Sequence, residues 1–324
     1  MHSVQELQKI INKAITDTVY TEKPAELYEP ISYLMDIGGK RMRPVLVLVS
    51  TELFGGDVTK ALNAAIGIEL FHNFTLMHDD IMDKAPLRRG KPTVHAKWSE
   101  SAAILSGDVM FVEAYKMIIR VEDTILREVL DIFSRTASGV CQGQQADMNF
   151  ENRGNVSIEE YLHMIKQKTA VLLAGSMQIG ALIGGADQNQ ARLIYEFGEN
   201  LGLAFQLQDD ILDVYGDPEK FGKQVGGDIL ANKKTFLLIK AKELTAQNQS
   251  SELAWWLDGK THDPIEKINA ITSIYDSLGV RKLAERQMEE FVLRALAALD
   301  EISAKNDTKI LLKNFAESLL VREH

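Results

Sequence analysis

Two clusters of aspartates, each set in an apolar run that favours a helix, constrain this chain more than any other feature. The two clusters are Asp79, Asp80 and Asp83, and Asp209, Asp210 and Asp213. In a helix the first and last carboxylates of each cluster are four residues apart and share one face. Because like charges this close repel one another, each cluster needs either solvent or a cation.

The ligand chemistry of both clusters favours magnesium. They offer hard carboxylate oxygens and no histidine or cysteine, and Mg²⁺ bound in this way usually keeps several waters and bridges to substrate phosphates. One cluster alone could be a solvated helix turn. Two clusters in apolar surroundings instead predict two helices that face each other across a cavity and hold a diphosphate through three Mg²⁺ ions.

Length and patterning predict one helical domain. The chain has 324 residues, of which 45% are hydrophobic, and no Pro-, Gly- or Ser-rich linker divides it. No strand-like alternation is apparent, whereas apolar residues recur at helical spacing. We therefore expect an all-α fold over residues 1–324, a bundle of about ten or more helices around a central cavity.

The charge and the cysteine content argue against several classes of protein and of binding site. A formal net charge of −10 argues against nucleic-acid binding. Cys141 is the sole cysteine, so the chain has no disulfide framework or thiolate metal site, and we expect a buried thiol. The N-terminus lacks the pattern of a signal peptide, and residues 170–186 are interpreted as a core helix rather than a transmembrane span. These features predict a cytoplasmic protein.

Local signals place several helix boundaries. Residues 4–15 form an amphipathic stripe, and Pro24 and Pro30 bracket a short second segment. Ser106-Gly107-Asp108 opens a helix that runs to residue 119. Ser157 and Glu160 have the spacing of a capping box.

Cations gather at two places that suit an anion. The run from Gly38 to Pro44 ends one helix and starts another, with Lys40, Arg41 and Arg43 where positive charge opposes the helix dipole. The alternatives are a solvated basic turn and an anion site, and we favour the anion site. Paired arginines that follow the first aspartate cluster in a loop could each grip phosphate oxygens. They are Arg88 and Arg89.

Two further side chains have open interpretations. His72 precedes Asp79 by two helical turns and is either a core histidine or a ligand. Lys168, at the start of an apolar run, either extends its charge to water along an apolar stem or contacts a phosphate.

In order along the chain, these motifs resemble those of the trans-isoprenyl diphosphate synthases. The matching motifs are Gly-Gly-Lys-x-x-Arg-Pro, a histidine seven residues before DDxxD, Arg-Arg-Gly after it, Gly-Gln, Lys-Thr, Phe-Gln-x-x-Asp-Asp-x-x-Asp and Gly-Lys. This family, also called polyprenyl synthetases, includes farnesyl and geranylgeranyl diphosphate synthases. The resemblance extends from about Gly38 to Thr235.

The resemblance implies a prenyltransferase with the isoprenoid-synthase type of helical bundle. Such an enzyme condenses isopentenyl diphosphate head-to-tail with an allylic diphosphate (dimethylallyl, geranyl or farnesyl) by ionisation, condensation and elimination. It requires Mg²⁺ and is expected to be a homodimer.

The resemblance also assigns site residues. The magnesium ligands would be Asp79, Asp80, Asp83, Asp209, Asp210 and Asp213, with Asp209 the strongest of the second set. The allylic diphosphate would contact Arg88, Lys168, Thr169, Gln206, Lys223 and Lys233, with Lys234 an alternative to Lys233. Isopentenyl diphosphate would contact Lys40, Arg43, His72 and Arg89. The catalytic set would be Asp79, Asp80, Asp83, Lys168, Thr169, Gln206, Asp209 and Lys223.

Bulk before the first aspartate cluster forms the floor of the product pocket in this family. Phe74 and Thr75, five and four residues before Asp79, therefore suggest a short product, geranylgeranyl diphosphate. A farnesyl product comes next, and then a longer chain. A terpene cyclase would leave Lys40, Arg43 and Arg89 without a purpose. A non-catalytic synthase subunit would be expected to have lost the aspartates.

Overall fold

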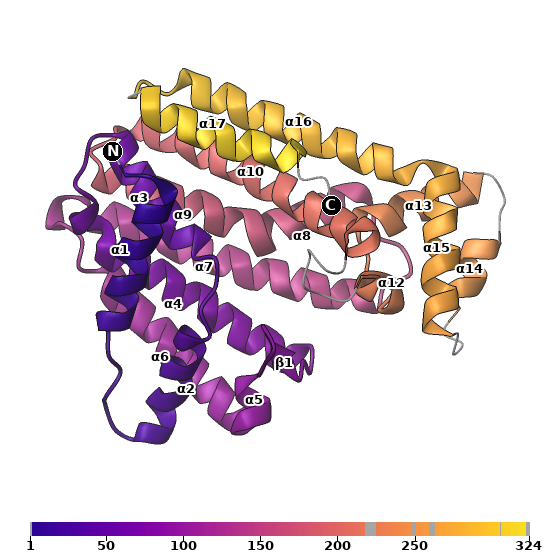
Figure 1. Cartoon of the computed structure of the whole chain (residues 1–324), viewed down its shortest axis with the longest axis horizontal. Helices are drawn as coiled ribbons and strands as arrows, with labels where there is room; N and C mark the ends of the chain where they lie inside the picture. The colour runs from indigo at the N-terminus through magenta and orange to yellow at the C-terminus, as the bar shows by residue number, and fades with distance from the viewer. Residues whose placement is uncertain (1, 218–224, 248–250, 259–262, 305, 322–324) are drawn as a thin grey trace. The chain divides into compact units, whose positions relative to one another are not determined.

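A computed structural model describes the chain over residues 2–217, 225–247, 251–258, 263–304 and 306–321. Over these residues the secondary structure is helical apart from one small hairpin, which confirms the all-α fold (Figure 1). The backbone contacts divide the chain into two compact units. The first unit comprises residues 1–137, 175–195 and 302–309, and the second comprises 138–174, 196–301 and 310–324. That all 324 residues act as one domain stays a prediction.

Helices α1 to α6 and the hairpin belong to the first unit. They are α1 (Val4–Asp17), α2 (Ala25–Asp36), α3 (Met42–Leu53), α4 (Val58–Met82), β1 (Leu87–Arg88), β2 (Lys91–Pro92), α5 (Val94–Lys97) and α6 (Glu100–Ile118). The aspartate helix α4 packs against α3 and α6.

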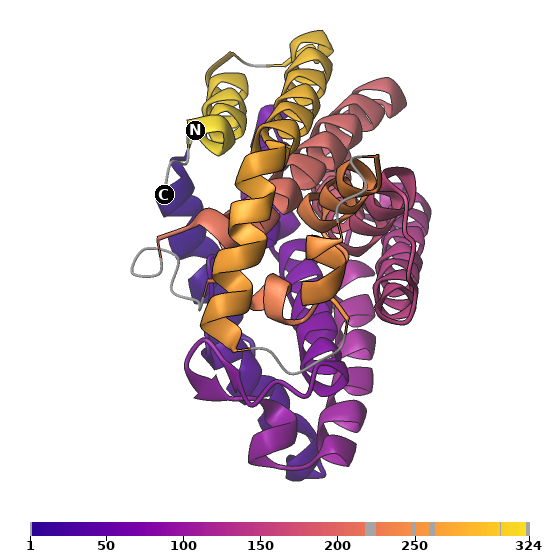
Figure 2. The same cartoon turned by 90° about the vertical axis from the view of Figure 1, so that its right-hand side faces the viewer.

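The second unit holds most of the later helices. They are α8 (Ile158–Ile165), the π-helix η1 (Lys166–Ala170), α12 (Gly227–Leu230), α13 (Phe236–Gln247), α14 (Glu252–Trp256), α15 (Pro264–Leu278) and α16 (Val280–Glu301). Helix α15 packs against α12, α13 and α14, and Figure 2 shows its long ribbon beside α14. Four helices contribute residues to both units: α7 (Asp123–Glu151), α9 (Val171–Ile183), α10 (Gln188–Tyr215) and α17 (Asn306–Val321).

Helix starts follow the caps that the sequence offers. Ser3 caps α1, and Ser157 with Glu160 forms the predicted capping box of α8. The prediction that Pro24 and Pro30 bracket a short segment is wrong at its second end. The helix continues past Pro30, which lies inside α2. A proline at this position removes one backbone hydrogen bond, because it has no N–H, and the helix continues around it.

Helix α6 begins at Glu100, capped by Ser99, so the start predicted at Ser106 is wrong. Gly107 instead lies within the helix. A Cβ there would be 2.3 Å from Nε2 of His78 on α4, so the glycine makes room for an imidazole. The glycine here allows close packing between two antiparallel helices, α4 and α6. In the sequence alone, a glycine with this role looks the same as a glycine at a helix start.

The predicted loop around the paired arginines is a β-hairpin, although no strand had been expected. Leu87 pairs with Pro92, and Arg88 with Lys91. Arg89 and Gly90 between them have φ of 53° and 74°. Two positive φ values in a two-residue turn suit the twist of a hairpin, and glycine adopts them at no steric cost. The hairpin is therefore local to its turn and does not alter the fold class.

Two predictions about residues 141–186 have different outcomes. Helix α9 is almost entirely buried, as expected of a core helix. Within the described residues, no helix is both long and apolar enough to cross a membrane. Cys141, in contrast, is exposed, so the expectation of a buried thiol is wrong. It lies on the outward face of α7, where helical spacing alone had not fixed which residues point outwards.

Candidate active site

The first aspartate cluster lies at the C-terminal end of α4, with its three carboxylates in different surroundings. Asp83 is exposed and Asp79 is partly exposed, whereas Asp80 is buried with 2% of its surface accessible. The first and last members of the motif therefore reach solvent, and their spacing of four residues is that of side chains on one helix face. The middle member points into the protein and needs a partner there.

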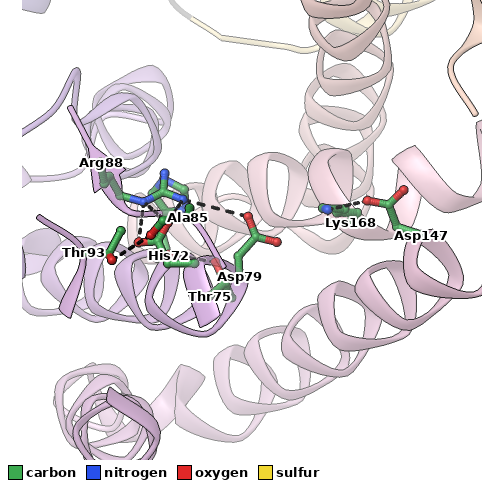
Figure 3. A network of polar contacts seen from close by, with 9 residues as sticks. His72, Thr75, Asp79, Ala85, Arg88, Thr93, Asp147 and Lys168 are labelled. Atoms are coloured by element: carbon green, nitrogen blue, oxygen red, sulfur yellow. Dashed lines mark hydrogen bonds and ion pairs between the residues drawn. The ribbon is translucent and has the colours of Figure 1, made fainter. Parts of the chain in front are cut away.

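Arg88 from the hairpin supplies that partner. Its Nε lies 2.8 Å from Oδ2 of Asp80, and its Nη2 lies 2.7 Å from Oδ1. This two-pronged contact is the strong geometry for a guanidinium and a carboxylate. The same Nη2 is 4.0 Å from Oδ2 of Asp79. Figure 3 draws Arg88 pointing towards this carboxylate. Arg88 thus holds Asp80 directly and adds positive charge beside Asp79.

Arg89, the other arginine of the hairpin, belongs with Arg43 to a cationic cluster around His72. Nη1 of Arg43 is 3.1 Å from Nε2 of His72. Burial, and then the charges of Arg43 and Arg89, hold the pKa of His72 well below its usual value. The imidazole is therefore neutral, accepts the Arg43 hydrogen bond through Nε2, and has its Nδ1–H available as a donor.

Backbone shape brings Arg89 into this cluster. Gly39 has a φ of 150°, and a Cβ on it would be 2.4 Å from Nη1 of Arg89. The guanidinium therefore lies against the glycine backbone. Lys40, next in the chain, is exposed. The resemblance had grouped four residues as the isopentenyl diphosphate site: Lys40, Arg43, His72 and Arg89. All four belong to the first unit, and the last three interact electrostatically.

Lys168 and Thr169 lie on the π-helix η1, where an ordinary helix was expected. Nζ of Lys168 is 2.6 Å from Oδ2 of Asp147, the contact drawn in Figure 3. Oγ1 of Thr169 donates to Oε1 of Gln206 at 3.0 Å. Single π-turns of this kind are frequent at functional sites because they re-aim side chains. Nothing in the sequence predicted this ion pair.

The second aspartate cluster repeats the arrangement of the first. Asp209 and Asp213 are partly exposed, and Asp210 is buried with 4% of its surface accessible. Tyr161 donates its hydroxyl hydrogen to Oδ2 of Asp210 at 2.5 Å, and Nε2 of Gln206 donates to Oδ1 at 3.2 Å. Burial raises the pKa of Asp210 to about 7, although these hydrogen bonds act in the opposite direction. No spacing or motif had pointed to Tyr161.

Asp213 accepts backbone hydrogen bonds that stabilise a turn. Its Oδ2 accepts from the backbone N–H of Asp228 at 2.9 Å, and its own carbonyl oxygen accepts from Gly226. That Asp209 ranks first among the ligands of the second cluster stays a prediction.

Lys233 and Lys234, which follow this cluster in the sequence, differ in their contacts and burial. Nζ of Lys233 is 3.8 Å from Asp228, whereas Lys234 donates to the backbone carbonyl of Asn232 and is partly buried, which lowers its pKa. Lys233 is thus the more accessible cation, and its contact with the diphosphate stays a prediction. Lys223 lies outside the described residues.

Each aspartate cluster fits magnesium as a partial ligand set. Within the described residues, no three His, Cys, Asp or Glu side chains converge closely enough to hold a metal by themselves. Mg²⁺ is commonly bound through one or two carboxylates, with phosphate and water oxygens completing its octahedron. The solvent-facing pair in each cluster suits that role, whereas Asp80 and Asp210 are engaged by protein donors.

The residues expected at the floor of the product pocket pack differently from each other. Phe74 is buried and stacks on Phe111 of α6, with ring centroids 4.9 Å apart and planes within 7°. Phe71 and Phe133 complete an aromatic cluster. Thr75 is only partly buried, and its hydroxyl donates to the backbone carbonyl of His72. Phe74 is therefore held in place by aromatic neighbours.

An all-helical protein with two DDxxD helix turns and clustered arginines and lysines is built for metal-assisted chemistry on diphosphates. The model of the family described as polyprenyl synthetase matches residues 24–275. This chain belongs to that family and is a prenyltransferase of the isoprenyl diphosphate synthase class.

Individual relatives match almost the whole chain. A geranylgeranyl diphosphate synthase from Methanosarcina mazei is 36% identical over 97% of this chain and 95% of its own. The crystal structure of a geranylgeranyl pyrophosphate synthase matches with 43% identity and a TM-score of 0.94, covering 100% of both chains. The geranylgeranyl pyrophosphate synthase of Corynebacterium glutamicum, crystallised with isoprenyl diphosphate and magnesium, matches with 27% identity and a TM-score of 0.89 over 99% of this chain and 100% of its own.

Proposed function

We propose that this chain condenses isopentenyl diphosphate head-to-tail with allylic diphosphates and releases geranylgeranyl diphosphate. The observation that carries the proposal is the cationic cluster of Arg43, His72 and Arg89, which offers hydrogen-bond donors without a metal ligand set. An enzyme with a single diphosphate substrate would not need it. The names of the relatives and the buried Phe74 support geranylgeranyl as the product.

The aspartate clusters would serve the allylic substrate. Asp79 and Asp83, and Asp209 with Asp213, would hold three Mg²⁺ ions through their solvent-facing oxygens. Once bound, the metal supplies Lewis-acid stabilisation of the charge that develops on the leaving diphosphate. Asp80 and Asp210 would act by orienting Arg88 and Gln206, with which they hydrogen-bond.

Cations of the chain would complete the allylic diphosphate site. Arg88 and Lys168 each already contact a carboxylate, so an incoming diphosphate would share or replace Asp79 and Asp147 as their partners. Lys223 and Lys233 would add further positive charge. The hydroxyl of Thr169 and the amide of Gln206, hydrogen-bonded to each other, would present dipoles to the developing allylic cation.

The second substrate would bind through side chains alone. Lys40, Arg43 and Arg89 would bind the diphosphate of isopentenyl diphosphate, and the neutral His72 would donate through Nδ1. A neutral imidazole avoids repulsion from the neighbouring guanidiniums. After carbon–carbon bond formation, a proton leaves the new chain to the departing diphosphate, so no basic side chain is required.

We also propose that the chain forms a homodimer. Helix α6 exposes Leu105 and Val112, with 58% and 54% of their surfaces accessible, on one outward face. Apolar side chains grouped on a helix face favour association. Light scattering of the purified protein would measure the mass, and a monomer at assay concentrations would contradict this part of the proposal.

The activity is tested by incubating the protein with Mg²⁺, labelled isopentenyl diphosphate and, in turn, dimethylallyl, geranyl and farnesyl diphosphates. We expect all three starters to be extended to a product of 20 carbons, measured by chromatography of the released alcohols. A protein that is folded by circular dichroism but extends none of them would contradict the proposal. A shorter or longer product would retain the reaction and change only the assigned length.

A further inference from the structure

A buried ion pair lies directly behind the cationic cluster. Nη1 of Arg41 is 2.5 Å from Oε1 of Glu69 on α4, and the two residues have 6% and 3% of their surfaces accessible. Nη2 of Arg41 also donates to the backbone carbonyl of Met35, and Nδ2 of Asn73 donates to the same Glu69 oxygen at 3.0 Å. Arg41 is thereby tied both to α4 and to the last turn of α2.

The backbone at Arg41 is unusual in a way that this ion pair accounts for. Its φ is 49°, in the left-handed region that non-glycine residues rarely adopt, and it immediately precedes the first residue of α3. An unfavourable backbone conformation persists where surrounding contacts fix it. The turn at Arg41 separates Lys40 from Arg43, so it sets the direction in which each of these side chains leaves the chain.

Charge balance gives Glu69 a second role. Burial lowers the pKa values of His72 and Arg89, the charge of Arg41 lowers them further, and Glu69 acts on the pKa of Arg89 in the opposite sense. The carboxylate therefore offsets part of the repulsion among the guanidiniums that surround His72. Without it, Arg41 would be a buried charge with a backbone carbonyl as its remaining acceptor.

We propose that Arg41 and Glu69 are positioning residues for the isopentenyl diphosphate site: their ion pair fixes the left-handed turn that aims Lys40 and Arg43 at the diphosphate. This inference rests on the proposed function, because it assumes that Lys40 and Arg43 bind that substrate. Neither Arg41 nor Glu69 touches the substrate in this arrangement, since both are buried and engaged with each other.

The test measures the KM of each substrate separately in Glu69→Gln and in the double variant Arg41→Met/Glu69→Met. For Glu69→Gln we expect the KM of isopentenyl diphosphate to rise about tenfold, the smaller of the losses typical when an orienting partner is removed. The KM of the allylic substrate should change less than about twofold, and the melting temperature should fall because a charge is left buried. Glu122→Gln, which breaks an exposed ion pair with Lys60 on α4, is the matched control and should change neither KM.

The double variant separates positioning from stability. Replacing a buried ion pair by apolar side chains often restores stability, so its melting temperature should recover while the KM of isopentenyl diphosphate stays raised. A KM that recovers together with the melting temperature would overturn the inference and leave the ion pair a purely structural role. If Glu69→Gln does not fold, the double variant and Arg41→Lys, which keeps the charge but not the fork, provide the same comparison.

Lys40→Ala distinguishes failure of this inference from failure of the proposed function. A raised KM for isopentenyl diphosphate in Lys40→Ala, with unchanged values in the Glu69 and double variants, would refute positioning by the ion pair and keep the substrate assignment. An unchanged KM in Lys40→Ala would instead refute the assignment of the site, and the inference with it.

Discussion

His72 is the residue whose chemistry the structure specifies most closely. Its pKa is held below the ordinary value of about 6.5 by burial and neighbouring guanidiniums, so the folded protein keeps the ring neutral. The unfolded chain takes up a proton at this position as pH falls below that value, and the folded chain does not. His72 therefore contributes stability above pH 6.5 that is lost as the pH falls towards its folded pKa.

We accordingly predict that His72→Gln flattens the dependence of stability on pH. Between pH 7 and pH 5 the free energy of unfolding of the natural chain should fall more steeply than that of the variant, by at most about 1.4 kcal/mol per pH unit. Urea titrations at each pH would measure it. His163→Gln, at an exposed histidine on α8, is the control and should leave the slope unchanged, whereas equal slopes for all three proteins would show that His72 titrates normally.

Phe74 carries the prediction about product length. Its ring is buried and stacked on Phe111, so Phe74→Ala should open space against α6 and lengthen the product by at least one isoprene unit. Chromatography of the product alcohols measures the change. Thr75→Ala removes a smaller side chain whose hydroxyl contacts only the backbone of its own helix in the described structure, and it should have the weaker effect. An unaltered product from Phe74→Ala would place the floor elsewhere.

At the scale of elements, the π-helix η1 depends on the helices that pack on it. A Cβ at Gly143 of α7 would be 2.1 Å from the backbone nitrogen of Lys168, and a Cβ at Gly202 of α10 would be 2.6 Å from Cα of Ala170. Both glycines therefore allow backbones to touch. This close approach places Lys168 and Ala170 directly against α7 and α10, which residues 166–170 alone do not reveal.

Gly143→Ala should consequently destabilise the protein and weaken use of the allylic substrate. We expect a loss of about 1–3 kcal/mol, the usual cost of overpacking, because the clash is with backbone that cannot move aside. The KM of the allylic diphosphate should rise as Lys168 is displaced. Gly154→Ala, at an exposed glycine with no atom within 4 Å, is the control for the substitution itself. Equal denaturation midpoints for both variants would contradict this account.

For the whole molecule, metal should matter to turnover and not to folding. Each compact unit has its own buried apolar residues. The packing of these residues against one another involves no metal ligand. We predict that EDTA abolishes product formation while the far-ultraviolet circular dichroism and its thermal midpoint stay unchanged. Added Mg²⁺ should restore activity. Turnover that persists in EDTA, or helicity lost on chelation, would contradict this separation.

The predictions made from sequence succeeded where neighbouring residues decide. The capping box at Ser157 and the shared face of the first and last aspartates of each cluster follow from helical spacing over a few residues. The family follows from many motifs in a fixed order. Errors came where a residue's role depends on a distant partner, as at Gly107, whose apparent helix break accommodates His78.

Sequence by itself thus determined the helical class, the two aspartate turns and the chemistry of their ligands, because these depend on residue type and on a period of 3.6 residues. Only tertiary structure decided that Asp80 and Asp210 point inwards to Arg88 and Tyr161, and that Glu69 holds Arg41 in a left-handed turn. These contacts join residues from 8 to 49 positions apart. A pairing between such positions is set by packing, which no local spacing encodes.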